Sequence, residues 1–314
     1  MAQFQWQFDA PTGVYKQHAL SSRLYEAALA ESKFVEHVRP IEGYGKNKGE
    51  TITITRVKNI TEPTSPVLDE GTRISEDSFV INTVNLTVQE IGRAVPYTSL
   101  SLDLSEFDLE NPIQKKLKAQ MTLSLDTLCA AAFKGCQIAY TPTSLTAGTF
   151  DTDGTTSTTA TANMNVFHVE EIADYLYDTL MCPPAVDDDY IGIFRRLGIR
   201  GIKRDPSWEE WHKYSDPQAK FNGEVGRIER VRFVETNHSN ALAKKGTSSV
   251  LGEGVVFGED AVVMAEALTP ELRAAMPDDF GRSKAVAWYG ILVFDEIWNT
   301  SNAGEARIVH VDSA

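Results

Sequence analysis

The feature that most constrains this fold is a stretch of extended chain that is too long for one ordinary strand. The pattern predicts extended chain from about Ser78 to Tyr97, with Val84, Leu86 and Val88 on one face and polar residues between them. At about 3.3 Å per residue it would reach about 65 Å if unbroken, whereas ordinary strands have only about five or six residues. Thr51–Thr55 alternates in the same way. The two segments together predict a long antiparallel β-hairpin.

This hairpin, residues 46–98, needs a surface outside itself, because a two-stranded hairpin alone is marginal in water. Its tip, Pro63–Asp77, is rich in proline, glycine and charge. We expect the tip to have few apolar groups to bury and to touch a neighbouring subunit through charged side chains. The candidate contact residues on the hairpin are Lys58, Glu70, Arg73 and Glu76.

A long amphipathic helix follows the hairpin. Asn111 and Pro112 form a helix start signal, with asparagine as the N-cap and proline in the first turn. Apolar residues then recur every four positions, at Ile113, Leu117 and beyond. The pattern predicts one helix over residues 112–137, about 39 Å long at about 1.5 Å per residue.

The remaining segments alternate between short helices and strands, which gives an α+β fold with a hairpin projecting from a compact body. The threonine-rich segment 141–161 has a hairpin-favouring Asp153-Gly154, but its composition equally fits a surface loop. We expect helices at Leu20–Val35, from Asn165 to Pro183, after a capping box at Ser207–Glu210, and at Thr269–Glu271. We expect strands at Tyr190–Phe194, Arg227–Val234, Gly254–Gly258, Ala285–Phe294 and Ala306–Val311, and another through Val262 and Val263.

Composition excludes several function classes. The 314 residues include 44 acidic and 30 basic side chains, for a net charge of −14. Phosphate groups repel such an acidic surface. We therefore expect neither recognition of nucleic-acid grooves nor membrane binding through a basic helix. No apolar run approaches the roughly 20 residues that cross a bilayer, and no secretory signal is visible. Three scattered cysteines give no disulfide framework, so we expect synthesis in the cytosol.

Three patterns suggest metal binding, and each lacks part of the ligand set. His168–Glu170 (His-Val-Glu) matches half of a zinc deaminase signature, but Cys182 does not supply the missing cysteine pair. Cys129 and Cys136 lie on one face of the long helix, where thiols serve as small apolar side chains. Asp187–Asp189 lacks the glycine and glutamate of a calcium loop. We therefore expect no metal and no cofactor.

No pattern establishes catalysis either. Trp208 and Trp211 flank Glu209 and Glu210, which would suit a carbohydrate-active enzyme, but no partner carboxylate can be placed. Helical spacing puts both tryptophans on one face, which favours packing. Nucleophile-elbow and phosphate-loop motifs are missing from the sequence. We expect no enzyme activity, with the carbohydrate-active enzyme kept as an alternative.

The order of these elements, together with several short phrases, resembles the major capsid proteins of tailed bacteriophages, which have the Hong-Kong-97-type fold. The phrases cover nearly the whole chain: Gly49–Ile52, Leu68–Gly71, Phe221–Ile228, Arg232–Asn237, Val256–Ala261 and Trp288–Gly290. The resemblance implies an N-terminal arm, an extended hairpin called the E-loop, a long spine helix, and peripheral and axial domains. The implied segments are 1–45 (arm), 46–98 (E-loop), 99–184 (spine helix and part of the peripheral domain, with 141–161 as an insertion), 185–284 (mainly axial domain) and 285–314 (C-terminal strands returning to the peripheral domain).

The resemblance also implies a function. The chain would assemble into hexamers and pentamers of an icosahedral shell that encloses double-stranded DNA without sequence-specific binding. Residues 1–45 are too short for a fused scaffold, so a separate scaffolding protein and a portal are implied, and a decoration protein is compatible. The protein would be made in the host cytoplasm and reside in the virion capsid. Some relatives cross-link lysine to asparagine, but no partner asparagine is identified for Lys58. An encapsulin-like compartment with a protein cargo remains an alternative.

Overall fold

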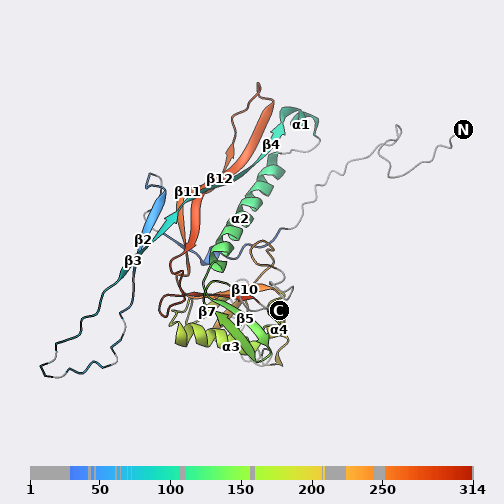
Figure 1. The fold of residues 1–314 in the computed structure, drawn as a ribbon. Coiled ribbons are helices and arrows are strands. Elements are labelled where there is room, and N and C mark those ends of the chain that lie inside the picture. The colour runs from blue at the N-terminus through green and yellow to red at the C-terminus, as the bar shows by residue number, and fades with distance from the viewer. Residues whose placement is uncertain are drawn as a thin grey trace.

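The computed structural model describes residues 29–312 except 42–43, 46, 61, 64, 69, 72, 106–109, 156–159, 207, 209–223 and 244–251. It has two layered bodies joined by one long helix, with a hairpin that projects sideways from the body (Figure 1). No helix in this described part combines the length and apolar character that crossing a bilayer requires. The α+β class expected from the sequence is confirmed.

The first body is a four-stranded sheet with the long helix on one face. The strand order is β1 (Arg39–Pro40), β11 (Val262–Ala274), β12 (Ser283–Glu296) and β4 (Gln89–Thr98). β1 runs parallel to β11, and the other neighbours are antiparallel. Helix α2 (Glu110–Lys134) packs on this sheet through Leu117, which joins Val286 and Trp288 in a small buried cluster.

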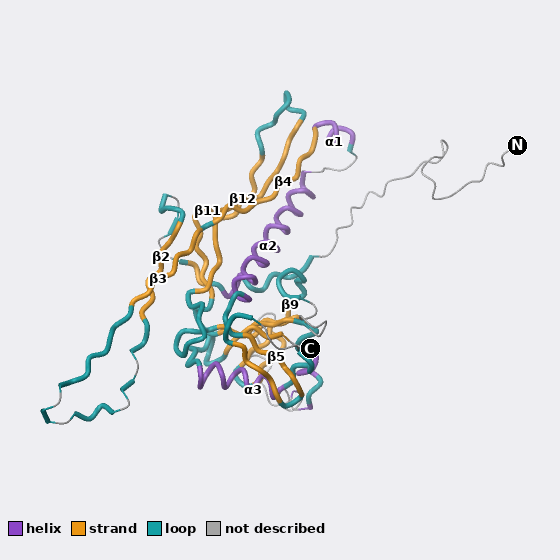
Figure 2. The backbone as a smooth tube through the Cα atoms, in the orientation of Figure 1, coloured by secondary structure: helices purple, strands orange, loops and turns teal. Residues whose placement is uncertain are grey.

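The second body is a seven-stranded mixed sheet (Figure 2). Its order is β6 (Ala147–Asp151), β5 (Ala139–Ser144), β13 (Ile308–Asp312), β10 (Glu253–Phe257), β7 (Tyr190–Arg195), β9 (Val231–Thr236) and β8 (Glu224–Ile228). Helix α3 (Val166–Asp174) continues into a π-helical turn, η2 (Tyr175–Thr179), and packs against this sheet. The described residues also form three short helices, η1 (Val35–His37), α1 (Ser99–Leu104) and α4 (Arg200–Lys203). Strands β2 (Thr51–Val57) and β3 (Ile81–Thr87) form the projecting hairpin.

The helices predicted over 112–137 and from Asn165 are confirmed, with ends that differ: α2 ends at Lys134, and α3 with η2 ends at Thr179 rather than at Pro183. α2 begins at Glu110, so Asn111 and Pro112 lie inside its first turn instead of capping it. Proline is tolerated there because first-turn N–H groups have no intrahelical partner. The α3 start is as predicted: the Asn165 side chain caps the helix by accepting a hydrogen bond of 3.3 Å from the His168 N–H.

The helix predicted at Thr269–Glu271 is wrong, because this segment lies inside strand β11. The β11–β12 ladder continues on both sides of Pro270, with register shifts between Glu266 and Leu268 and between Leu268 and Glu271. Proline cannot donate to a ladder and is accommodated in sheets at such irregularities. Gly290 makes room opposite, since a Cβ there would lie 2.8 Å from the Pro270 ring.

One predicted strand and one predicted turn also differ from the structure. The stretch Arg227–Val234 is not one strand, because Glu229 and Arg230 adopt positive φ angles of 45° and 61° and turn β8 into β9. The hairpin within 141–161 turns at Leu145-Thr146, between β5 and β6, rather than at Asp153. Asp153 instead accepts hydrogen bonds from Thr155. The first strand of this segment is a strand of the seven-stranded sheet and not a separate loop.

Each sheet combines strands from more than one of the expected segments. β11, expected within the axial segment 185–284, belongs to the four-stranded sheet, and β13, expected to return to the peripheral domain, pairs with β10 in the seven-stranded sheet. Strands β5 and β6 also lie in the seven-stranded sheet. Long-range hydrogen bonding decides this membership, and local sequence patterns do not encode it. The helix expected at Leu20–Val35 lies mostly outside the described residues; of its described part, 29–34 is not helical, and Val35 begins η1.

Candidate subunit interface

The projecting hairpin is the candidate site, and its two strands pair as the sequence predicts. β2 (Thr51–Val57) and β3 (Ile81–Thr87) run antiparallel, from Thr51 opposite Thr87 to Val57 opposite Ile81. Within the described residues no third strand joins this sheet. The long extended stretch therefore divides at Val88: the part before it forms β3, and the part after it forms β4, which pairs with β12.

The root of the hairpin is anchored in the body. Leu86 has an exposed fraction of 0%, whereas the outer residues of the hairpin are exposed. The Arg56 guanidinium donates a 2.8 Å hydrogen bond to the Ile297 carbonyl and lies 5.1 Å from the centre of the Trp298 ring. Arg56 therefore fixes the direction in which the hairpin leaves the body, since a planar guanidinium holds both contacts at once.

Lys58, predicted to touch a neighbour, has a partner in its own chain. Its ammonium lies 3.4 Å from a carboxylate oxygen of Glu305. Thr300 and Asn302 donate hydrogen bonds of 3.0 and 3.2 Å to the other carboxylate oxygen. Burial alone would raise the pKa of Glu305, but these hydrogen bonds and the Lys58 charge hold it below its usual value. Lys58 thus forms part of the hairpin's attachment to the body.

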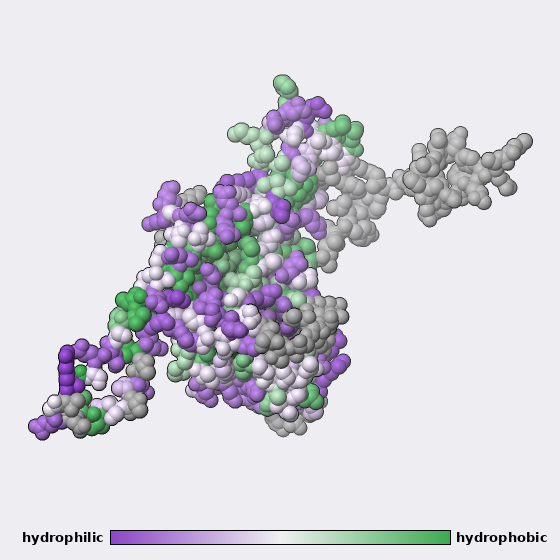
Figure 3. Space-filling view, viewed as in Figure 1, coloured by the Kyte–Doolittle hydropathy of each residue, from purple (hydrophilic) through white to green (hydrophobic). Residues whose placement is uncertain are grey.

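The large apolar side chains at and beside the tip of the hairpin are exposed to solvent. No strand forms in the described residues between Val57 and Ile81. Several large apolar side chains there are mostly exposed: Val67 (80%), Ile74 (64%), Phe79 (60%) and Leu68 (59%). Hydrophobic residues along this arm are visible in the space-filling view (Figure 3). The expected tip, Pro63–Asp77, holds Val67, Leu68 and Ile74 among its proline, glycine and charged residues, and the apolar run Phe79–Ile81 follows it. The structure leaves these apolar side chains exposed within their own chain.

The other predicted contact residues lie at the exposed tip. Arg73 and Glu76 form an ion pair with each other, and their side chains are 85% and 75% exposed. Glu70 is exposed as well. An ion pair this exposed contributes only about 0–1 kcal/mol, so its charges are available to a second surface.

An apolar groove lies elsewhere on the body, between β4 and the start of α2. Its volume is about 410 Å³, and it is lined by Val95, Pro112, Ile113, Lys116, Leu117 and Gln120. Aliphatic side chains dominate this lining, with one lysine among them. Such a groove suits an apolar side chain flanked by an acidic one.

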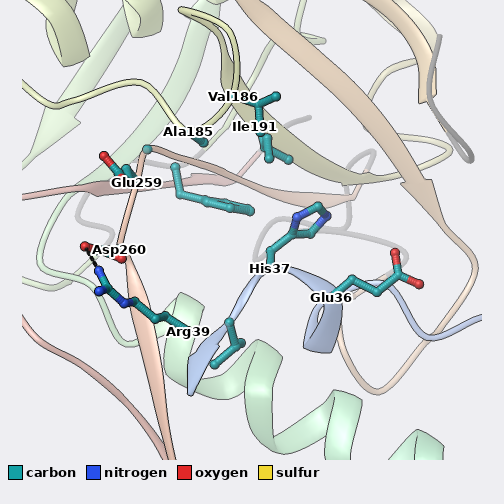
Figure 4. Close-up of a pocket in the computed structure, with 11 residues that line it drawn as sticks. Glu36, His37, Arg39, Ala185, Val186, Ile191, Glu259 and Asp260 are labelled. Atoms are coloured by element: carbon teal, nitrogen blue, oxygen red, sulfur yellow. Dashed lines mark hydrogen bonds and ion pairs between the residues drawn. The ribbon is translucent and has the colours of Figure 1, made fainter. Parts of the chain in front are cut away.

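A second depression, of about 460 Å³, lies where η1 and β1 meet the seven-stranded sheet (Figure 4). Arg39 forms a 2.6 Å ion pair with Asp260 across it. The His37 ring lies 5.6 Å from the Phe257 ring, and burial lowers the pKa of His37. Glu36 points away from Arg39 and Asp260 in Figure 4, so these charged groups do not converge on one point.

The side chains in the sequence patterns that suggested metal binding form hydrogen bonds and ion pairs within the chain. The Tyr140 hydroxyl lies 2.7 Å from Nδ1 of His168 and donates a hydrogen bond to Glu171. Burial lowers the pKa of His168, which favours its neutral form. Asp189 is buried and paired with Arg232 at 2.6 Å. The described part of the chain holds no group of three His, Cys, Asp or Glu side chains arranged for a metal.

The cysteines and tryptophans considered above are packing residues where the structure describes them. Cys129, Cys136 and Cys182 are buried and free, and burial raises the pKa of each, to about 12 for Cys136 and Cys182. Trp208 packs edge-on against Phe233 with ring centres 6.0 Å apart. Glu209 and Trp211 lie outside the described residues, as does most of the predicted capping box.

Comparison with known proteins supplies the fold family. No protein-family model matches the chain, and no curated protein sequence matches it significantly. Solved structures do match over almost the whole length. The capsid of Helicobacter pylori bacteriophage KHP30 superposes with a TM-score of 0.70 at 13% identity, covering 96% of each chain. The capsid of cyanophage Pam1 gives 0.69 at 14% identity, covering 100% of each.

A third example, the capsid of Ralstonia phage GP4, gives a TM-score of 0.66 at 15% identity and covers 98% of this chain and 97% of that one. These capsid chains share only 13–15% of their residues with this chain, yet the match covers almost the whole of each chain. The hairpin, the long helix and the two sheets are therefore parts of one known fold. The chain has the Hong-Kong-97-type fold of tailed-bacteriophage capsid proteins.

Proposed function

We propose that this chain is the major capsid protein of a tailed bacteriophage, which self-assembles into hexamers and pentamers of an icosahedral shell around double-stranded DNA. In this role it is a structural protein without enzyme activity and resides in the virion capsid after assembly in the host cytoplasm. Several solved structures that share its fold are the capsids or heads of phages.

One observation carries this proposal: the hairpin presents apolar side chains to solvent, and nothing within its own described chain covers them. Val67 and Ile74 are 80% and 64% exposed at the end of an arm with only two strands. Burying such side chains is favourable by about 1.5–3 kcal/mol each, and an isolated subunit lacks this stabilisation. A second copy of the chain offers a surface that recurs at every subunit, and such head-to-tail contacts close into rings.

The candidate receiving surface is the groove between β4 and α2. Its apolar lining suits Val67 or Ile74, and Lys116 on the groove complements the acidic Glu70 and Glu76 beside them. In this arrangement the arm of each subunit lies over the long helix of the next. The four-stranded body would then be the peripheral domain, and the seven-stranded body would be the axial domain.

The partners outside the shell are also part of this proposal. A separate scaffolding protein and a portal complete assembly, and a decoration protein is compatible with the exposed outer surface. Packaged DNA is enclosed rather than bound, because a net charge of −14 repels phosphate and leaves the genome free to move.

Electron microscopy of the purified protein, expressed with and without the phage's scaffolding protein, tests the proposal. We expect rings or closed shells that are uniform in size. A compact 34.7 kDa monomer at every concentration, with scaffold present, would overturn it. Double-stranded DNA in native particles supports the capsid, whereas a protein cargo without DNA would indicate an encapsulin-like compartment.

A further inference from the structure

The densest positive charge in the chain lies at the end of strand β7 and on helix α4. Five of the 30 basic residues fall within residues 195–204, and no acidic residue lies among them. Helix α4 is on the side of the seven-stranded body that faces away from the projecting hairpin (Figure 1). We call the four arginines of this segment the arginine cluster: Arg195, Arg196, Arg200 and Arg204.

The arginine cluster lacks counter-ions in its own chain. Arg196, Arg200 and Arg204 are exposed, and none of them has an ion-pair partner within the described residues. The fifth cation of the segment, Lys203, differs because its ammonium pairs with Glu235. Other exposed arginines also have carboxylate partners, as in the pairs Arg273–Glu271 and Arg282–Asp279. In a chain with 44 acidic side chains, a group of unpaired arginines is therefore a distinct feature.

Arg195 has a guanidinium nitrogen without a partner. Its Nη1 atom is buried and makes no hydrogen bond in the part of the chain that the structure describes. Burial lowers the pKa of this guanidinium, and no neighbouring carboxylate offsets the effect. A buried donor on a charged group is costly when it has no acceptor. An anion bound beside Arg195 would supply the missing acceptor.

The backbone holds these side chains in fixed positions. The Gly198 N–H donates a 2.8 Å hydrogen bond to the Arg195 carbonyl and closes the turn after β7. Ile202 of α4 is buried in the core of the seven-stranded body. Arg200 and Arg204 are four positions apart on α4 and its C-cap, so they share one helix face, where like charges repel each other. The fold thus maintains charge repulsion on a rigid support, which suits a preorganised anion-binding surface.

We propose that the arginine cluster binds the phosphate backbone of the double-stranded DNA that the shell encloses. This contact rests on the proposed function and adds a binding surface to it. Guanidinium groups bind phosphate through paired N–H donors. Duplex DNA carries one negative charge per about 1.7 Å of its axis, so a short stretch can supply a phosphate to each arginine. An acidic protein segment, the alternative partner, seldom carries charge at this density.

The contact is compatible with the acidic surface of the protein as a whole. The net charge of −14 repels phosphate elsewhere, so binding is confined to the arginine cluster and is weakened by salt. Contacts to the phosphate backbone carry no sequence information, and they let a protein slide along DNA. The enclosed genome therefore stays free to move during packaging.

Fluorescence anisotropy tests the contact, with a labelled DNA duplex titrated by unassembled full-length subunits at several salt concentrations. The cluster variant carries Arg196→Gln, Arg200→Gln and Arg204→Gln. We expect it to bind DNA about tenfold more weakly than the wild type at low salt. The slope of log affinity against log salt should become shallower by about 2 to 3, since each lost phosphate contact accounts for about 0.9. Arg196→Lys, Arg200→Lys and Arg204→Lys together keep the charge and should retain most of the affinity.

A matched control separates the cluster from net charge. It carries Arg73→Gln, Arg273→Gln and Arg282→Gln, which removes the same number of charges from other parts of the surface. This control should bind DNA within about twofold of the wild type. Both glutamine variants change exposed side chains, so their melting temperatures should stay within about 2 °C of the wild type.

Two results would overturn the contact: wild-type subunits that bind no DNA at low salt, or equal losses in the cluster and control variants, which would assign binding to net charge alone. Polyglutamate tests the alternative partner. If it binds wild-type subunits more tightly than DNA does, and the cluster variant loses that binding, the partner is an acidic protein segment and the DNA contact is wrong.

These measurements use unassembled subunits, so their result does not depend on shell formation. Wild-type shells in electron micrographs, together with a failed DNA-binding test, would overturn the DNA contact and leave the proposed function standing. DNA binding that requires the arginine cluster, without any shells, would support the contact and overturn the proposed function.

Discussion

Nδ1 of His238 lies 2.8 Å from one carboxylate oxygen of Asp126, and both side chains are buried. Asp126 lies on α2, and His238 follows β9 of the seven-stranded sheet. The other oxygen of Asp126 accepts hydrogen bonds from the Ser32 hydroxyl and from the N–H groups of Lys33 and Phe34, at 2.9 to 3.0 Å. One carboxylate on the long helix therefore joins three parts of the chain.

This junction predicts a large effect for one substitution. Asp126→Ala would leave two backbone N–H groups and an imidazole buried without an acceptor, so we expect a loss of about 2–5 kcal/mol in unfolding free energy. Chemical denaturation measures the loss. Asp103→Asn, an exposed carboxylate on α1, is the control and should change stability by less than about 0.5 kcal/mol. Equal effects of the two variants would contradict the junction's importance.

The junction also shows the limit of what the sequence predicts. The long helix, the hairpin strands and α3 follow from local periodicity and caps, which adjacent residues determine. Asp126 gives no such signal, because its partners lie more than 90 positions away in the sequence. The only signal in the sequence for this junction was a charged residue on an otherwise apolar helix face.

Sheet membership was unpredictable for the same reason. Whether β13 pairs with β10 or with a strand of the other sheet depends on contacts about fifty residues apart in sequence. Pro270 misled the prediction because Thr-Pro-Glu is a local helix start signal, which pairing with β12 overrides. At the candidate interface, the hairpin was predictable and the apolar character of its tip was visible, whereas the Lys58–Glu305 pair was not.

The anchoring of the hairpin by Arg56 predicts a local change in dynamics. Arg56→Ala removes the hydrogen bond to Ile297 and the stacking on Trp298. The hairpin strands β2 and β3 should then move more freely relative to the body, and the body should stay folded. We expect amide hydrogen exchange in residues 51–57 and 81–87 to accelerate at least fivefold, with little change in the seven-stranded sheet. Arg73→Ala, whose partner Glu76 lies on the same tip, should leave that exchange unchanged.

The tip of the hairpin should matter for assembly and not for folding of the subunit. Replacing Pro63–Asp77 by a short Gly-Ser linker removes side chains that touch little in their own chain, so the subunit's melting temperature should stay within about 2 °C. Shell formation should be abolished or misdirected. Electron microscopy and a thermal melt measure the two outcomes.

Two double variants distinguish apolar from charged contacts of the tip in assembly. Val67→Asp with Ile74→Asp should block shell formation, because it puts charge where apolar burial is proposed. Arg73→Ala with Glu76→Ala removes an exposed ion pair and should permit assembly at close to the normal concentration. The reverse result would mean that charged contacts carry this interface, as the sequence analysis first expected.

Glu296, at the end of β12, predicts a pH dependence of stability. Its exposed fraction is 4%, and burial, with a smaller contribution from the Asp295 charge, raises its pKa from 4.5 to about 8. The carboxyl lies beside Gly135 at the end of α2, since a Cβ at Gly135 would be 3.3 Å from Oε1, and the negative end of the helix dipole also disfavours a charge there.

Between pH 4.5 and 8 the folded protein therefore holds a proton on Glu296 that the unfolded chain releases. Stability then falls as pH rises through this window and levels off above it. Glu296→Gln is always neutral and escapes this loss, so we expect it to match the wild type near pH 4.5 and to exceed it by up to about 4 kcal/mol near pH 8. Denaturation curves at several pH values measure the difference. Glu271→Gln, 55% exposed on the neighbouring strand β11, should show no such trend, and an equal gain at every pH for Glu296→Gln would argue that packing, not ionisation, sets the effect.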